Sequence, residues 1–408
     1  MEVSAGNNQS MDEHYGMLTR DAAGQGVKAK PVNIVMRTIR RWINEGLLAN
    51  GELIPSIRTI AGQLDCTNYA VDKALQMLAR EGWINKSGRA YMVARKTSPG
   101  SNSTLSNTIA VLINESKMPV PGQTTTGTLW EIVYQAFQSI SQHARNCLRI
   151  DPELMSADEL VRLIYDRPQG VIAFREAMLH FTSYGILSEL ARSGIPLVVY
   201  GYDAQLQMYD SVRSDLEAGT YMLTRHLIEQ GHKRILRYWC LRSDQSQNPP
   251  WLADRDAGYE KAMQEAALEP MPALRCADLP FPVSSKSKFD MKVAYATGQL
   301  TKYINEYGQI DAVMAITDEV CFQLAAACEA MKLTPQRDVV IAGYDNYWQG
   351  CPENQYYSQP PLTVTVDTQT GIMGTELAGL LFDRIEGKLD SGPQMRVIEP
   401  RLIITSDT

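Results

Sequence analysis

Apolar residues recur at every third or fourth position in two adjacent stretches near the N-terminal end of the chain. Ile57, Ile60 and Leu64 mark the first stretch, and Val71 and Leu78 mark the second. This spacing predicts two short helices that each bury one face. A polar sequence, Asp-Cys-Thr-Asn, separates them and predicts a tight turn.

Hydroxyl side chains stand where both helices should begin. Ser56 and Thr67 can each accept a free amide from the first turn of the helix that follows. Two short helices joined by a polar turn form a helix-turn-helix, whose second helix can enter a DNA major groove. Residues 82–93 then read as strand, basic glycine turn and strand, which predicts a β-hairpin wing directly after the second helix.

From residue 108 onward, short continuous apolar runs alternate with helical patterns. Such runs are typical of strands that are covered on both faces, and their alternation with helices predicts an α/β fold with parallel strands. The expected strands are too many for one sheet of usual size, so two lobes are predicted. They are Ile109–Ile113, Gly170–Phe174, Ile195–Tyr200, Ser211–Arg213, Arg234–Trp239, Ala312–Ile316 and Val339–Gly343.

Composition divides the 408 residues into four segments. Residues 1–29 are polar and small and predict a disordered tail. Residues 30–96 form the predicted winged helix-turn-helix domain, and residues 97–106 are a linker rich in Ser and Thr. Residues 107–408 form the predicted two-lobed α/β domain.

Charge separates the first domain from the rest of the chain. Residues 30–97 carry 11 Lys and Arg against 5 Asp and Glu, a net charge of +6, whereas the whole chain carries −7. Positive charge concentrated in one segment of an acidic protein is typical of a nucleic-acid-binding module. The alternative interpretation of residues 30–96 is a generic helical domain that does not bind nucleic acid.

Several classes of protein find no support in the sequence. The 7 cysteines form no Cys-x-x-Cys pair and the 5 histidines are scattered, so no metal site is predicted. No zinc-protease, dinucleotide-binding or nucleophile-elbow motif occurs, and we expect no catalytic residues and no cofactor. No apolar run is long enough to span a membrane and no signal peptide is recognisable, so the expected location is the cytoplasm.

Residues 30–96 resemble the winged helix of the GntR family of bacterial transcription regulators. The resemblance rests on Ile-Pro-Ser-Ile-Arg at 54–58, on Ala-Leu-x-x-Leu-Ala-x-Glu-Gly at 74–82, and on the wing. It implies that the second helix enters the major groove. Asn68 and Asp72 stand where the family has arginines, and Asp72 would repel a phosphate. The residues expected to contact DNA are Arg58, Thr67, Asn68, Tyr69, Lys73, Lys86 and Arg89.

Residues 107–408 resemble the effector-binding domain of the LacI family and the related periplasmic sugar-binding proteins. The resemblance rests on motifs such as Arg-x-x-Gly-Tyr at 255–259, Ala-Ile-Thr-Asp at 315–318 and Ala-Gly-Tyr-Asp at 342–345. It implies that a small ligand, a sugar, binds between the two lobes. Arg255 would bond ligand hydroxyls or carboxylates, with a salt bridge inside the lobe as the alternative. Thr317, Asp318, Tyr344 and Asp345 complete the set that the resemblance implies.

Two further residues are candidates for the cleft. Trp130 opens the first helix of the second domain, where the family places aromatic side chains that stack on ligands, although ordinary core packing is an equal alternative. Arg175 follows the second expected strand directly and could point into the cleft, or it could be solvated.

The sequence therefore predicts a ligand-responsive, sequence-specific transcription regulator that is not an enzyme. The resemblances imply a repressor of sugar-utilisation genes that its sugar effector releases from double-stranded operator DNA, working as a homodimer. Two alternatives remain. A transport-type solute-binding protein is opposed by the basic winged helix, and a winged helix fused to an enzyme domain is opposed by the lack of a catalytic constellation.

Overall fold

In the computed structural model the chain divides into two compact units, residues 1–102 and 103–408. The predicted tail, Arg89, Arg175 and most of the predicted linker lie outside the described residues. The structure describes residues 31–44, 47–49, 51–80, 83–88, 90–94, 105–114, 128–155, 167–174, 187, 190–202, 204–241 and 249–405.

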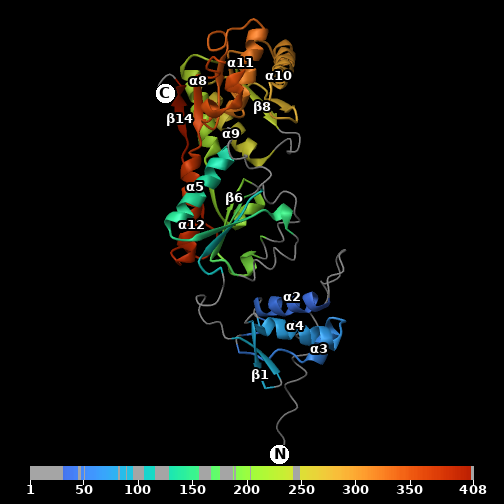
Figure 1. Cartoon of the computed structure of the whole chain (residues 1–408). Helices are drawn as coiled ribbons and strands as arrows, with labels where there is room; N and C mark the ends of the chain where they lie inside the picture. Colours follow the sequence, from blue (N-terminus) through green and yellow to red (C-terminus); the bar gives the residue numbers. More distant parts are fainter. Residues whose placement is uncertain are drawn as a thin grey trace, which may run out of the picture. The chain divides into compact units, whose positions relative to one another are not determined.

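The first unit is a winged helix. Its helices are α2 (Pro31–Asn44), α3 (Ile57–Gln63) and α4 (Asn68–Arg80), and its wing is β1 (Ile84–Ser87) paired antiparallel with β2 (Ala90–Val93) (Figure 1). Both predicted caps are confirmed, because Ser56 Oγ accepts the amide of Thr59 and Thr67 Oγ1 accepts the amide of Ala70, each at 3.2 Å. These bonds satisfy donors that the first turn of a helix leaves free.

One apolar core holds the first unit together. Ile39 and Trp42 from α2, Ile60 from α3 and Leu75 from α4 are buried in it with Ile84 of the wing. The apolar residues that recur at helical spacing in the sequence therefore form the buried faces of α3 and α4, and the other residues of these helices lie at the surface.

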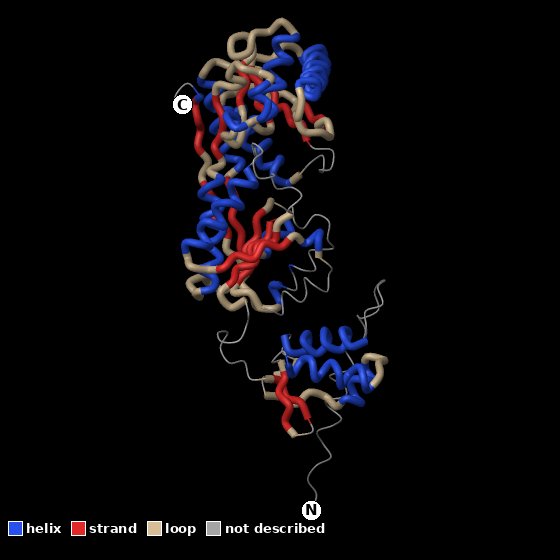
Figure 2. Tube along the Cα trace, viewed as in Figure 1, coloured by secondary structure: helices blue, strands red, loops and turns tan. Residues whose placement is uncertain are grey.

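The second unit contains two six-stranded sheets, each between helices (Figure 2). The sheet of the first lobe has the order β13-β7-β6-β5-β3-β4 and is parallel throughout. Its strands are β3 (Thr108–Leu112), β4 (Asn146–Ile150), β5 (Gly170–Phe174), β6 (Leu197–Tyr200), β7 (Asp210–Ser214) and β13 (Met395–Ile398).

The sheet of the second lobe has the order β14-β12-β11-β10-β8-β9. It is parallel except that β12 pairs antiparallel with β14. Its strands are β8 (Ile235–Leu241), β9 (Leu274–Ala277), β10 (Ala312–Ala315), β11 (Val340–Ala342), β12 (Val364–Asp367) and β14 (Arg401–Ile404). Its helices are α8 (Leu216–Glu229), α9 (Pro250–Glu265), α10 (Lys286–Tyr307) and α11 (Asp318–Ala330).

Two helices of the first lobe lie side by side, α5 (Thr128–Gln142) and α12 (Thr370–Ile385) (Figure 1). Gly374 permits their close approach, since a Cβ atom there would meet the Ile132 carbonyl oxygen at 2.3 Å. The chain passes between the lobes at residues 214–216, 367–370 and 398–401. The start of α12 is thereby placed at the boundary between the lobes.

The predicted fold class is confirmed, with a winged helix and a two-lobed parallel α/β unit. All seven expected strands are present as β3, β5, β6, β7, β8, β10 and β11. The sequence reading omitted β4, β9, β12, β13 and β14, together with α12. Four of these omitted strands lie at the edges of the two sheets.

Candidate nucleic-acid interface and ligand pocket

Helix α4 has one buried and one exposed face. Ala70, Val71, Ala74, Leu75 and Leu78 are buried in the core of the first unit. The opposite face is polar, and its tyrosine, Tyr69, is 74% exposed. Asn68, Lys73 and Gln76 are also exposed on this face. A helix with such a face can lie in a major groove and contact the edges of the bases there.

Arg58, Thr67 and Lys86 are exposed as well. Arg58 lies in the first turn of α3, and Lys86 lies on the wing, whose turn residue Gly88 has a φ of +62°. All the sequence-predicted DNA contacts within the described residues are therefore at the surface, and Arg89 falls outside them. The exposed amide of Gln76 was not predicted, although its position one turn after Asp72 could have indicated it.

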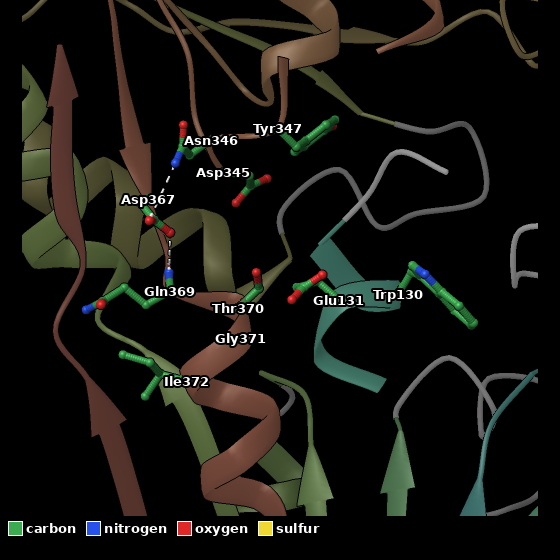
Figure 3. Close-up of a pocket in the computed structure, with 10 residues that line it drawn as sticks. All are labelled: Trp130, Glu131, Asp345, Asn346, Tyr347, Asp367, Gln369, Thr370, Gly371 and Ile372. Carbon is green, nitrogen blue, oxygen red and sulfur yellow. Dashed lines mark hydrogen bonds between the residues drawn. The ribbon is translucent and has the colours of Figure 1, made fainter. Parts of the chain in front are cut away.

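A pocket of about 510 Å³ lies between the two lobes of the second unit (Figure 3). The first lobe contributes residues from the starts of α5 and α12, and the second lobe contributes the segments that follow β11 and β12. In Figure 3 the carboxylates of Asp345 and Glu131 stand on opposite sides of the pocket. The lining residues are Trp130, Glu131, Asp345, Asn346, Tyr347, Asp367, Gln369, Thr370, Gly371 and Ile372.

The passage from β12 into α12 is held by Asp367. Its Oδ1 accepts the backbone amide of Gln369 at 2.7 Å, and its Oδ2 accepts from Asn346 Nδ2 at 3.5 Å (Figure 3). Gln369 has a left-handed backbone with φ of +57°. The carboxylate therefore ties the two segments of the second lobe to the start of α12.

Asp345 occupies a strained position at the pocket wall. Its φ is +92°, and its backbone amide donates to the Val366 carbonyl at 2.7 Å. Such backbone strain in a non-glycine residue is typical of functional sites. Burial raises the pKa of the Asp345 carboxyl to about 6, and the nearby guanidinium of Arg255 opposes that rise.

Arg255 stands behind Asp345 and is only 5% exposed. Its Nη1 donates to the Ile316 carbonyl at 2.6 Å, and its Nη2 lies 3.9 Å from Asp345 Oδ1. The guanidinium carbon lies 3.5 Å from the ring centre of the buried Tyr344. Within the described residues its Nε has no hydrogen-bond partner.

Asp318 is fully buried, and both of its oxygens have partners. Oδ1 accepts from Thr365 Oγ1 at 2.7 Å, and Oδ2 accepts the amides of Tyr347 at 2.7 Å and Trp348 at 3.1 Å. Burial raises the pKa of this carboxyl to about 7, although these donors oppose the rise. Gly343 leaves room for it, because a Cβ atom there would meet Asp318 Oδ1 at 2.1 Å.

The structure brings two of the predicted effector residues, Trp130 and Asp345, to the pocket. Arg255, Tyr344 and Asp318 lie behind its wall as supporting groups, and half-buried Thr317 precedes α11 without a side-chain cap bond. Arg175 lies outside the described residues. The other eight lining residues were not predicted. Asn346 and Tyr347 directly follow the Ala-Gly-Tyr-Asp motif, which was an available signal.

Other kinds of site find no support in the described part of the chain. It contains no group of three or more His, Cys, Asp or Glu side chains placed to hold a metal ion. Among its helices, none is both long and apolar enough to cross a membrane. The fold and the pocket thus define a winged helix joined to a two-lobed α/β unit that has a pocket between its lobes.

Known families match both parts. Residues 31–91 match the bacterial regulatory proteins of the gntR family, and residues 224–406 match the periplasmic binding protein-like domain. The chain therefore joins a GntR-family regulatory domain to a periplasmic-binding-protein-like domain. Both resemblances found in the sequence are confirmed.

Individual relatives agree with this assignment. The chain is 27% identical over 247 residues to the HTH-type transcriptional repressor PurR of Escherichia coli O1:K1, covering 60% of this chain. The match spans 62% of that repressor's length.

Solved structures of similar fold include a transcriptional regulator CelR–cellobiose complex, with a TM-score of 0.54 and 21% identity over 86% of this chain and 99% of that chain. A LacI-family regulatory protein from Chloroflexus aggregans has a TM-score of 0.55 and 22% identity over 73% of this chain and 96% of that chain.

Proposed function

We propose that this protein is a ligand-responsive, sequence-specific DNA-binding transcription regulator, and specifically a repressor that a small hydroxylated effector, a sugar, releases from its operator. Its place would be the cytoplasm, where the operator DNA lies. The proposal rests above all on one conjunction. The same chain exposes the polar face of α4 and holds a pocket lined from two lobes.

The chemistry of the pocket supports a polyhydroxylated ligand. Three carboxylates, Glu131, Asp345 and Asp367, can accept hydrogen bonds from hydroxyl groups, and the amides of Asn346 and Gln369 can both donate and accept. Trp130 offers an aromatic face for the apolar side of a sugar ring. A ligand that touches both lobes would stabilise their closed arrangement by its differential affinity for that state.

The regulatory step would couple this closure to DNA. In a homodimer on a two-fold operator, closure of the lobes would change the spacing of the two winged helices and so their affinity for the paired half-sites. The proposed homodimer can be checked by measuring the mass of the protein in solution by light scattering.

A thermal-shift screen of the full chain against pentoses, hexoses and disaccharides tests the effector. A ligand present at about 100 times its dissociation constant should add about 2.7 kcal/mol of stability. Asp345→Asn should weaken binding of that ligand by about ten- to hundredfold, because a charged acceptor is lost. Asp290→Asn, at an exposed position of α10 away from the lining residues, is the matched control and should bind normally.

DNA binding is measured separately, by fluorescence anisotropy on operators selected from random duplexes. The proposal requires that the wild type selects a sequence and that the sugar lowers affinity for it. A protein that binds sugar but selects no DNA would instead be a solute-binding protein. A protein that selects DNA but binds no sugar would need an effector of another class.

A further inference from the structure

Two polar side chains of α4, the half-buried Asp72 and the exposed Gln76, form a pair. Gln76 Nε2 donates to Asp72 Oδ2 at 2.8 Å, one helical turn away. Val71, Ala74 and Leu75 are buried on the opposite face, so the direction of the pair is fixed by the core of the unit. Asp72 forms no ion pair within the described residues, even though Lys73 is its neighbour.

The shared hydrogen bond leaves two groups available for a partner. Asp72 keeps Oδ1 as an acceptor, because Gln76 uses only Oδ2. The amide of Gln76 carries two hydrogens, and one of them remains free to donate. An acceptor and a donor therefore lie side by side on the helix face that would meet DNA.

A carboxylate on that face restricts what the DNA can offer. Phosphates repel it, since the backbone of DNA is uniformly negative. The hydrogen-bond donors in the major groove are the exocyclic amines of cytosine and adenine. Asp72 must therefore meet one of these two bases if the helix is to bind without leaving an unpaired, desolvated charge.

The flanking groups decide between the two bases. A C·G pair presents the cytosine N4 amine beside the guanine O6 acceptor, which complements the acceptor of Asp72 and the donor of Gln76. An A·T pair also presents a donor beside an acceptor, but adenine N7 adjoins the amine and would repel the carboxylate. Cytosine has only a C–H group at that place.

We propose that Asp72 and Gln76 act together as a base-reading pair for a C·G base pair in each operator half-site. Asp72 accepts from cytosine N4 and Gln76 donates to guanine O6. This inference rests on the proposed DNA-binding function. It gives a positive role to an aspartate that a DNA phosphate would repel.

The test compares full-length variants in selection from random duplex DNA, followed by dissociation constants at one fixed salt concentration. The wild type should select a C·G pair at one position of each half-site. Asp72→Asn should lower the preference for cytosine there by about tenfold and favour adenine, since an asparagine amide pairs with adenine N6 and N7. Gln76→Ala should lower the same preference several-fold. No other position of the motif should change.

Asp65→Asn is the matched control. It removes the same charge from the exposed turn before α4, at a φ of +46° that asparagine tolerates. It should raise affinity for all sequences slightly and leave the base preferences unchanged. A different base at the Asp72 position, or a profile that Asp72→Asn leaves unchanged, overturns the pairing while DNA binding stands. A wild type that selects no sequence overturns the proposed function as well.

Discussion

The outer face of α4 and the pocket between the lobes are built in opposite ways. The α4 face takes its side chains from one helix of 13 residues, and they stand in solvent with few internal bonds. The pocket takes its lining from three separate segments of the second unit, residues 130–131, 345–347 and 367–372, and buried polar groups hold those segments in place. Asp318 alone accepts three hydrogen bonds behind the pocket wall.

This difference separates binding from stability. Substitutions on the α4 face should change recognition of DNA while the fold stays intact, because surface substitutions rarely alter stability by more than about 0.5 kcal/mol. Substitutions behind the pocket should change the stability of the second unit and the ligand site together.

The largest effect is expected from Asp318→Ala. The change leaves the Thr365 hydroxyl and the amides of Tyr347 and Trp348 without their buried acceptor. We expect the second unit to lose about 3 kcal/mol of stability in denaturant unfolding, because each unsatisfied buried donor costs about 1 kcal/mol or more. Asp290→Ala, at an exposed ion pair of α10, should cost less than about 0.5 kcal/mol. If the two variants lost equal amounts of unfolding free energy, Asp318 would not support the pocket wall as proposed.

The sequence predicted the interior of each sheet but not its edges. Strands β3, β5 and β6 are covered on both faces and read as continuous apolar runs. Edge strands β4 and β13 alternate or are largely exposed, and they carry no such run. Strand β12 is interior, but a threonine and an aspartate interrupt its four residues. Because β12 was not predicted, the helix that follows it, α12, was not predicted either.

The same limit explains how much of the site was predicted. Asp345 follows a recognisable strand and motif, and Trp130 opens a recognisable helix. Gln369, Thr370 and Gly371 come to the pocket only because β12 crosses from the second lobe into α12. No local pattern encodes that crossing. On α4, by contrast, helical periodicity alone identified the exposed face. Only the hydrogen bond between Asp72 and Gln76 was not predicted from the sequence.

A smaller effect concerns pH. Burial raises the pKa of Asp318 and Glu353 to about 7 and that of Asp345 to about 6. The folded state therefore holds more protons than the unfolded state from about pH 4 to pH 7, and stability falls as pH rises through that window. We expect the second unit to lose at least about 1 kcal/mol between these limits.

Asp318→Asn should flatten this slope in unfolding measured at successive pH values. It should not abolish the slope, because Asp345 and Glu353 act with the same sign. A stability that increases from pH 4 to pH 7 would contradict the prediction.

In the first unit, Thr67→Ala should cost about 1 kcal/mol of unfolding free energy, since the hydroxyl that accepts the Ala70 amide is lost. Thr67→Ser retains that acceptor and should restore most of the stability. Thermal unfolding of the two variants against the wild type checks this. If the alanine and serine variants are equally stable, the cap contributes nothing to the unfolding free energy, and the only role left for Thr67 is contact with DNA.

The smallest effect on folding, and a distinct effect on recognition, is expected from Lys73→Ala. The side chain is exposed on α4 and makes no ion pair within the described residues, so stability should stay within about 0.5 kcal/mol of wild type. If Lys73 contacts a phosphate, affinity should fall about equally for every DNA sequence, and the slope of log affinity against log salt should decrease by about 1. Lys302→Ala, which removes an exposed lysine of α10 in the second unit, should leave that slope unchanged.

The opposite pattern, a loss confined to one base position, would make Lys73 a base contact beside Asp72 and Gln76. In either case the effect would appear in binding and not in folding, which is the contrast with the carboxylate of Asp318.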